Sequence, residues 1–381
     1  MIIKNRKIKI FFFIFASFIG LISVLKGFYD STFISFDFHY SPTKLVAEGI
    51  NHYQYILDGK HDHSIDDKLQ YAQNGNYAHG LFVLLIPLTW LDWESSKIVW
   101  ALINILISFL IPILICKKFN LSKYETLFIL IFFLSSTIFR IHIGYGQQTL
   151  LTYFFFILPF IFKSNLTTIL SGISFFKFNI GYALFLYFLS MRDIKKITLS
   201  LTPALIGWLS YSYLTDTILI KSLLDPFKVI LYWNSDSDHF PVTIFSLLKF
   251  INMPRIIIII VPIIISFFII LRLKKIKDEL LKLSLISLSA LCFLPHQLHD
   301  YVLLVPLLIF SVKNYSDLIS KINLLFIFYF FYFLRIISFF FDTQPWEFPY
   351  GYFGYLNNFI TITVLITNLY FIKILYKKSL D

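Results

Sequence analysis

Asp37 is the first residue along the chain whose surroundings suit chemistry, since it lies in the aromatic run Phe36-Asp37-Phe38-His39-Tyr40. A carboxylate between aromatic residues at the edge of a membrane is partly desolvated, which raises its proton affinity and suits it to act as a general base. An ordinary loop aspartate would explain the same residue type. We predict catalysis by Asp37, with His39 and Tyr40 beside it in the substrate pocket, and this pattern alone leaves the alternative open.

Lys177 lies inside an apolar segment, Ser171-Gly-Ile-Ser-Phe-Phe-Lys177-Phe-Asn179-Ile-Gly181. A lysine in hydrocarbon costs about 3 kcal/mol by insertion scales, so it should face an interior partner or an anionic ligand. The alternative is an ammonium that reaches the lipid surface. We favour a buried role for Lys177 and expect Asn179 in the same pocket.

Two arginines invite a similar interpretation. Arg335 lies in an apolar segment, where Asp342 could pair with it. Arg140 precedes Gly144-Tyr-Gly146-Gln147-Gln148, where glycine permits a break in helical geometry and the amides can line a polar pocket. Arg140 and Arg335 are therefore candidates, with Lys177, to bind an anion. Gln147 is a candidate to line the pocket.

The densest polar cluster beside the membrane is Pro295-His296-Gln297-Leu298-His299-Asp300-Tyr301. Histidine can donate to a phosphate or carry a proton, and Asp300 could orient it. A simple turn between two helices also favours proline and aspartate. We predict catalytic roles for His299 and Asp300, with His296 and Tyr301 in the substrate pocket.

Metal binding is not expected. His61-Asp62-His63 with Asp66 and Asp67 has suitable ligand types for a divalent metal, but such a run on a polar loop is usually just solvated. The two cysteines, Cys116 and Cys292, are far apart in sequence and suggest neither a disulfide nor a zinc site. Glycine-rich phosphate loops, a Ser-His-Asp order and a zinc protease signature are absent.

The elements that must position these residues are membrane helices. The 381 residues are 57% hydrophobic and only 14% charged, with a mean hydropathy of +0.74, which excludes a soluble enzyme, a disordered chain and a fibrous repeat. The net charge of +11 comes from short basic clusters between apolar runs, as in cytoplasmic loops, so nucleic acid is not an expected partner.

The fold class predicted is therefore all-α, a single polytopic membrane domain over 1–381 with about ten to twelve transmembrane helices. A long outside loop at 28–78 should carry interfacial helices, the first near 41–50, and further outside loops are expected at 215–241 and 342–354. The predicted spans are 8–27, 79–92, 96–116, 124–139, 147–163, 168–190, 197–214, 254–273, 281–295, 301–313, 322–341 and 356–376.

This path places both termini in the cytoplasm, together with most of the basic loops. One cluster disagrees, because Lys117, Lys118 and Lys123 fall outside. Either that loop breaks the positive-inside rule or a short span nearby is re-entrant.

Several segments together resemble the integral-membrane C-type (GT-C) glycosyltransferases, and among them family 87, which includes polyprenyl-phosphate-mannose-dependent alpha-mannosyltransferases. The segments follow one another in the family's order over about 30–310. Ala78 and His79 stand where the family has paired prolines, and Phe178 and Asn179 where it has Pro and Gln. The similar residues are Asp37-Phe38, Tyr40, Val46-Ala47, Gly49, Tyr53, Tyr55, Tyr77, Pro87-Leu88, Trp100, Gly146-Gln147, Gly172, Lys177, Pro295, His299, Asp300 and Tyr301.

This resemblance implies an inverting transferase that moves a hexose (mannose-like) or a pentose from a polyprenyl-phosphate donor to a hydroxyl of a lipid or glycan acceptor on the outer face. Asp37 matches the family's catalytic base, while Lys177, Arg140, Arg335 and His299 would stabilise the leaving phosphate. No cofactor is implied, and a divalent metal is not expected. The expected partners are membrane lipids, the polyprenyl-phosphate-linked sugar and a glycan or glycolipid acceptor.

The expected location is a bacterial cytoplasmic (inner) membrane. The abundance of Phe, Ile and Lys suits an AT-rich bacterial genome. Two other hypotheses fit the same residues. In a transporter or flippase of a lipid-linked sugar, Lys177 and Arg335 would line a translocation path. A structural membrane subunit would carry no activity.

Overall fold

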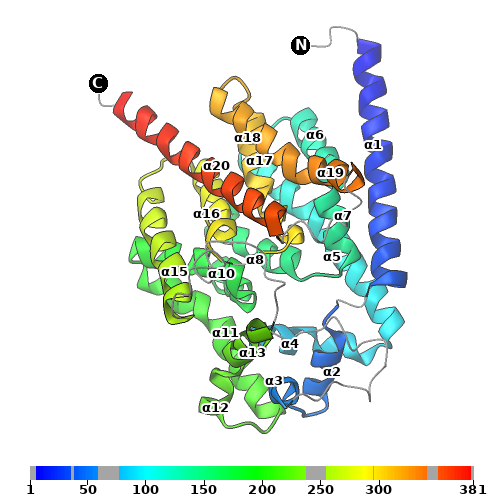
Figure 1. The fold of residues 1–381 in the computed structure, drawn as a ribbon, viewed down its shortest axis with the longest axis vertical. Helices are drawn as coiled ribbons and strands as arrows, with labels where there is room; N and C mark the ends of the chain where they lie inside the picture. The colour runs from blue at the N-terminus through cyan, green and yellow to red at the C-terminus, as the bar shows by residue number, and fades with distance from the viewer. Residues whose placement is uncertain are drawn as a thin grey trace.

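The computed structural model of the chain describes residues 6–35, 38–58, 77–236, 255–294, 296–340 and 351–378. Every regular element in these ranges is a helix, as the composition predicts (Figure 1). Asp37, the His61-Asp62-His63 run with Asp66 and Asp67, Pro295 and residues 342–350 of the last predicted loop lie outside the described residues. The predictions made for them stay predictions.

The helices of the first half of the chain are α1 (Arg6–Tyr29), the π-helical η1 (Asp30–Ile34), α2 (Tyr40–Ala47), α3 (His52–Leu57), α4 (His79–Leu85), the 3-10 helix η3 (Ile86–Trp90), α5 (Trp93–Lys118), α6 (Lys123–Leu134), α7 (Thr137–Gly144), α8 (Thr149–Ile161), α9 (Asn165–Ser171) and the 3-10 helix η4 (Gly172–Phe176).

The second half contains α10 (Phe178–Met191), α11 (Ile194–Leu214), α12 (Leu219–Leu223), α13 (Asp225–Asp236), α15 (Arg255–Leu273), α16 (Glu279–Phe293), the 3-10 helix η5 (Leu298–Leu304), α17 (Val305–Lys313), α18 (Leu318–Phe328), the π-helical η6 (Tyr329–Phe333), α19 (Leu334–Phe340) and α20 (Gly351–Lys378).

Two described helical stretches are long and apolar enough to cross a bilayer, Phe13–Ile34 and Trp93–Lys118. Helices α6 and α7 form a third crossing if they are counted as one span, bent by 58° at the break between them. The rest of the apolar bundle consists largely of shorter helices. The architecture is that of a polytopic membrane protein, but several of the predicted spans are broken helices.

The predicted span 79–92 does not cross the molecule. At its start, the Tyr77 carbonyl accepts a hydrogen bond from the Tyr53 hydroxyl of α3 at 2.6 Å, and at its end the Leu91 carbonyl accepts one from Tyr40 of α2 at 2.8 Å. Twelve helical residues reach only about 18 Å, well short of a bilayer core about 30 Å thick. The segment α4–η3 therefore returns to the side of the first loop.

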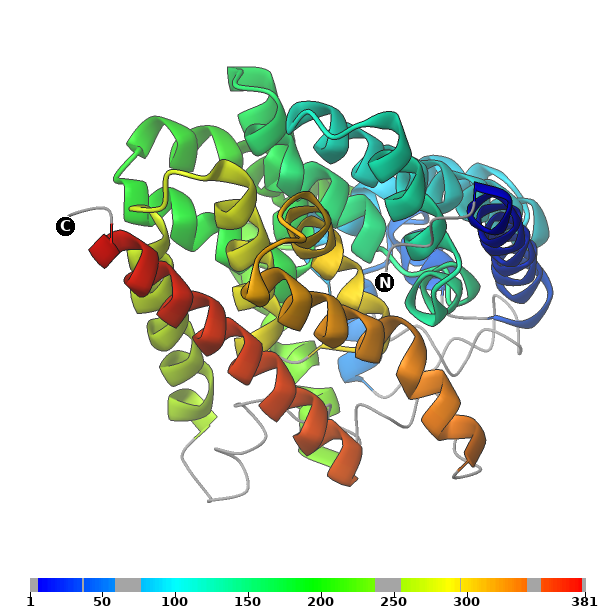
Figure 2. The same cartoon turned by 90° about the horizontal axis from the view of Figure 1, so that it is seen from above.

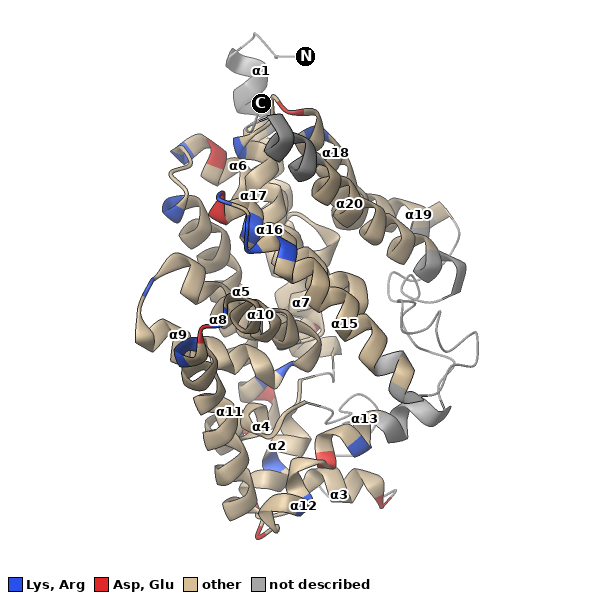
Figure 3. Ribbon diagram, turned by 90° about the vertical axis from the view of Figure 1, so that its left-hand side faces the viewer, with Lys and Arg blue, Asp and Glu red and all other residues tan. Residues whose placement is uncertain are grey.

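Because 79–92 does not cross, the loop with Lys117, Lys118 and Lys123 falls on the same side as the other basic loops. The Lys313 ammonium donates to the carbonyl of Phe119 at 3.1 Å, so residues 117–123 lie beside the loop that follows α17. Figure 3 shows basic residues near α6 and α16 at this end of the molecule, and α1 begins and α20 ends at the same end in Figure 1. The re-entrant alternative, with 79–92 as the segment that fails to cross, explains Lys117, Lys118 and Lys123.

The helix predicted at 41–50 is α2. Most of its residues are buried against α4 and η3. The chain leaves α2 at Gly49, whose φ of +83° glycine adopts without strain. At the start of α2, Phe38 and Tyr40 pack on Trp93 of α5.

Helices α4 and α11 form one of the closest crossings in the fold. A Cβ atom at Gly207 would lie 2.4 Å from the Cα of Gly80, so backbone meets backbone there. Seen from above, α1 stands at the edge of the bundle and α20 runs diagonally across it (Figure 2). Helix α20 packs on α16 and α18, and the largest buried apolar cluster lies between α5–α8, α16 and α17.

Candidate functional site

Lys177 lies at a break between two helices. Where the sequence predicts a continuous span over 168–190, the helix stops after Phe176 and restarts at Phe178, and Lys177 has an extended backbone with φ −111° and ψ 96°. Glycines make this break compact, because a Cβ at Gly172 would lie 1.9 Å from the Ser200 carbonyl oxygen and one at Gly181 2.6 Å from backbone atoms of η4. Non-helical backbone at membrane depth is tolerated when protein buries it.

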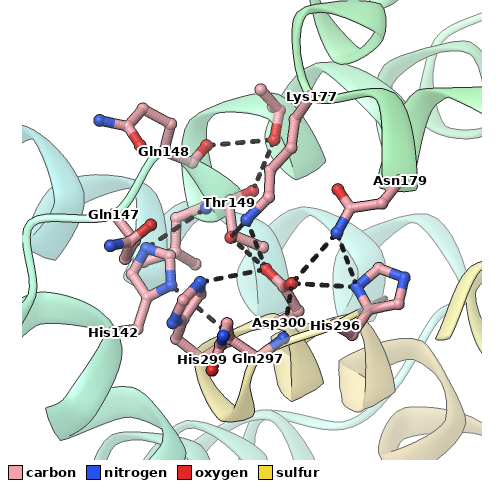
Figure 4. Close-up of polar contacts among 12 residues, drawn as sticks. His142, Gln147, Gln148, Thr149, Lys177, Asn179, His296, Gln297, His299 and Asp300 are labelled. Atoms are coloured by element: carbon pink, nitrogen blue, oxygen red, sulfur yellow. Dashed lines mark hydrogen bonds and ion pairs between the residues drawn. The ribbon is translucent and has the colours of Figure 1, made fainter. Parts of the chain in front are cut away.

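The Lys177 ammonium is buried and paired. It donates to the Thr149 hydroxyl and to Oδ1 of Asp300, both at 2.6 Å, and the Thr149 hydroxyl donates to the same carboxylate oxygen at 2.5 Å (Figure 4). The side chains of Lys177 and Asp300 are only 6% and 1% exposed. Two described residues thus account for two of the three ammonium N–H bonds, which leaves one for a ligand.

Asp300 accepts hydrogen bonds on both carboxylate oxygens. Oδ1 receives the bonds from Lys177 and Thr149, while Oδ2 receives one from Nδ1 of His296 at 2.9 Å and weaker ones from the backbone N–H of Gln297 and the amide of Asn179. A carboxylate with this many donors is held rigidly in its charged form. The geometry suits Asp300 to orienting the groups around it.

His296 lies between two oxygen acceptors. Its Nδ1 faces Asp300, and its Nε2 lies 2.7 Å from the carbonyl of Ala290 at the end of α16. Both contacts are donated by the ring only when both nitrogens carry protons. Asn179, whose amide nitrogen is 3.2 Å from His296 Nδ1, lies on the same side of the carboxylate in Figure 4.

The other side of Asp300 holds a second pair of histidines. His142 on α7 accepts the backbone N–H of Leu150 at Nε2, so its Nδ1 carries the proton and donates to the carbonyl of His299. His299 places Nε2 3.5 Å from Asp300 Oδ1, and its ring is 6.0 Å from that of His142. Figure 4 shows both histidines across the carboxylate from His296.

Tyr77 joins the first loop to this cluster. Its ring centroid lies 5.8 Å from the Lys177 ammonium, its hydroxyl donates to the Gln147 side chain at 3.4 Å, and its ring contacts that of His39 at 4.7 Å. The next residue, Ala78, donates its backbone N–H to the Phe176 carbonyl at 3.0 Å. The segment that enters α4 is therefore bound directly to the break that carries Lys177.

The structure brings together most of the predicted site residues but not all of them. Lys177, Asn179, His296, His299 and Asp300 converge, and His39 and Gln147 reach them through Tyr77. Tyr40 bonds to Leu91, and Tyr301 stacks on Phe330 at 4.0 Å with its hydroxyl toward Thr361 of α20. Arg140 lies on α7 two residues before His142. Arg335 lies on α19, and its side chain is not among those that the structure describes. No role of these residues is tested by their placement.

The sequence reasoning missed Thr149 and the position of Tyr77. Thr149 directly follows Gln147 and Gln148 at the first residue of α8, so a hydroxyl at the start of an apolar helix was the available signal. Tyr77 entered only through its resemblance to a family motif, since a lone tyrosine before an apolar segment indicates nothing about a lysine one hundred residues later.

The cluster can hold and neutralise an anion in a water-poor environment. A buried ammonium with an open N–H bond and imidazole donors would act on a negative charge far more strongly there than in water. Among the described residues, no three His, Cys, Asp or Glu side chains are arranged as metal ligands.

Fold and site define a helical membrane protein with a buried polar site at the junction of a broken helix and a loop. The family model of glycosyltransferase family 87 matches residues 77–295, which is more than half of the chain. The chain belongs to glycosyltransferase family 87 and is a glycosyltransferase, as the resemblance implied. No curated protein and no solved structure gives a significant match.

Proposed function

We propose that the protein transfers a hexose, mannose-like, or a pentose from a polyprenyl-phosphate donor to a hydroxyl of a lipid or glycan acceptor on the outer face of a bacterial cytoplasmic membrane. The observation that carries the proposal is the buried ammonium of Lys177, held at 2.6 Å from both Thr149 and Asp300 in a chain of this family. Such a cation stabilises the phosphate of a lipid carrier inside the membrane.

The reaction breaks the bond between the anomeric carbon and the phosphate oxygen and forms one between that carbon and the acceptor oxygen. The acceptor proton passes to Asp37 as general base, and the bonding electrons leave with the polyprenyl phosphate. Attack from the face opposite the phosphate inverts the anomeric centre. Lys177, with Arg140 and Arg335, would bind the phosphate as its charge develops, and His299 would donate to it.

In this proposal Asp300 positions Lys177, His296 and His299 and makes no contact with the sugar. The substrate pocket would be lined by His39, Tyr40, Gln147, Asn179, His296 and Tyr301. Cations of the side chains replace a metal, so the reaction needs no cofactor.

The neighbours of Asp37 support its placement in the same site. Phe38 stacks on Trp100 of α5 with ring centroids 5.3 Å apart, and the Trp100 indole N–H donates to the carbonyl of Gly146 at 2.6 Å. A Cβ at Gly146 would lie 3.3 Å from that of Phe38. The chain directly after Asp37 is therefore packed on the turn that carries Gln147.

The test is Asp37→Asn with a panel of polyprenyl-phosphate hexoses and pentoses, read by mass spectrometry for donor consumption and by donor-dependent thermal stabilisation for binding. General-base removal typically costs about 10²- to 10⁴-fold in rate. We expect the variant to lose turnover by that order while it still binds donor. Asp58→Asn, a carboxylate on the exposed end of α3, is the matched control and should keep full activity.

The alternatives give different results. A flippase would consume no donor and would move the lipid-linked sugar across vesicles equally well with Asp37→Asn. A structural subunit would neither bind nor consume any donor of the panel. Turnover by Asp37→Asn at the rate of the natural protein would refute the assigned base.

A further inference from the structure

His39 is a buried polar side chain whose ring has no hydrogen-bond partner within the described part of the chain. Only 4% of the residue is exposed, and neither ring nitrogen has a hydrogen-bond partner among the described residues. Its backbone is fixed, because the Thr43 hydroxyl donates to the His39 carbonyl at 2.6 Å in the first turn of α2. A buried imidazole with both nitrogens unsatisfied carries a desolvation penalty that a bound ligand can remove.

The ring of His39 adjoins the site around Lys177. It contacts the Tyr77 ring at 4.7 Å, the same ring that faces the Lys177 ammonium and whose hydroxyl bonds to Gln147. The remaining ring contact is Phe82 of α4, which is apolar and offers no hydrogen bond. Since the described residues offer His39 no hydrogen bond, a polar ligand bound beside Lys177 and Gln147 would be placed to supply one.

The protonation state of His39 indicates which kind of ligand group it can bind. Burial, and secondarily the positive charge of Lys177, lower the pKa of His39 from 6.5 to about 3. The ring is neutral near pH 7, so it has one N–H donor and one nitrogen acceptor. A hydroxyl can accept a hydrogen bond from the N–H of a neutral imidazole and donate one to its other nitrogen. A phosphate oxygen only accepts, and a cation would bind it better.

We propose that His39 is a sugar-hydroxyl ligand that selects the glycosyl group, next to the phosphate subsite of Lys177. The inference rests on the proposed function, since it names the group that recognises the transferred sugar. Tyr77 is a positioning residue in this subsite, because it contacts His39, Lys177 and Gln147 and is itself held by the Tyr53 hydroxyl on its carbonyl at 2.6 Å.

The experiment compares binding and transfer of polyprenyl-phosphate mannose, or of the hexose or pentose that the donor panel selects, with its monodeoxy analogues. Donor affinity is measured by the change in tryptophan fluorescence and kcat/KM by mass spectrometry. The variants are His39→Leu, which removes both ring nitrogens, and His39→Gln, which keeps one donor and one acceptor. Melting temperatures show that each variant is folded.

For the natural protein, we expect removal of one particular sugar hydroxyl to weaken binding and kcat/KM by about tenfold or more, since a buried polar group then loses its partner. In His39→Leu, the parent sugar and that analogue should become equal within about twofold. His39→Gln should restore part of the discrimination, which a merely structural role of the imidazole would not predict.

Tyr53→Phe tests the positioning of Tyr77 by removing one hydrogen bond to a backbone carbonyl. We expect a several-fold loss in discrimination without loss of fold. The matched control is Tyr332→Phe, whose hydroxyl likewise contacts the carbonyl of Phe132 and the Ser135 hydroxyl, between α6 and η6. Its discrimination should be that of the natural protein.

The failures can be told apart. If the natural protein binds donors and discriminates through His39 but transfers nothing, the proposed transferase reaction is wrong and the subsite stands. If it transfers sugar and His39→Leu keeps the full discrimination at every hydroxyl, the subsite is wrong and the transferase stands. Absence of both binding and transfer across the whole panel overturns both.

Discussion

Breaking the buried pair between Lys177 and Asp300 should destabilise the fold far more than breaking an exposed pair. Asp300→Asn keeps the shape of the side chain but leaves the ammonium, 6% exposed and 2.6 Å away, without its counter-charge. Loss of one member of a buried ion pair costs about 3–5 kcal/mol. The Lys177→Met change leaves the carboxylate with its other donors, so we expect a smaller loss of about 2–4 kcal/mol.

The two changes together should cost less than their sum. Because Lys177→Met/Asp300→Asn leaves neither charge buried alone, we expect a coupling energy of about 1–3 kcal/mol. The free energies of unfolding are measured by reversible denaturation in mixed micelles with tryptophan fluorescence. Asp193→Asn provides the control, since Asp193 and Lys196 form a 3.0 Å pair whose side chains are 34% and 45% exposed, and it should cost less than about 1 kcal/mol. Additive changes, or a loss for Asp300→Asn as small as the control's, would refute the pairing.

Two further predictions concern packing and pH. Gly207→Ala should lower the free energy of unfolding by about 1–3 kcal/mol, because its Cβ would meet the Gly80 backbone at 2.4 Å. The control is Gly20→Ala, which has nothing within 4 Å of its Cβ and should cost nothing. Equal melting temperatures for the two variants would contradict the close crossing. Because burial lowers the pKa of His39 to about 3, the unfolded chain binds the extra proton between that value and 6.5, and acidification from pH 7 to 5 should cost about 2 kcal/mol through this residue. The natural protein should therefore lose that much more stability than His39→Leu over this pH range, and parallel curves would show that His39 is not buried in its neutral form.

The membrane class and several members of the buried polar cluster were predictable from the sequence. Apolar runs separated by basic clusters determine the helical class, because a bilayer allows little else. Lys177 and the His296–Tyr301 segment stand out because ionisable residues are costly among apolar ones. Each of these signals is local in the chain, and so each could be found without knowing the fold.

The pairing of these residues was not predictable in the same way. Lys177 and Asp300 are brought together by a break between two helices, and periodicity shows an apolar segment there but not where its hydrogen bonds stop. The segment 79–92 was assigned as a span for a similar reason. Its composition is that of a membrane helix, and only its contacts with Tyr40 and Tyr53 show that it returns.

The return of α4–η3 has a functional consequence. If residues 79–92 crossed the membrane, Tyr77 and Leu91 would lie on opposite faces, and only one of them could contact the first loop. Because both ends stay on one side, α2 binds the end of the segment and α3 binds its start, while Ala78 is bonded to the helix break beside Lys177. The loop that carries His39 is thus assembled as one unit with the buried ammonium, and a change that loosens the loop should reach Lys177 through Tyr77.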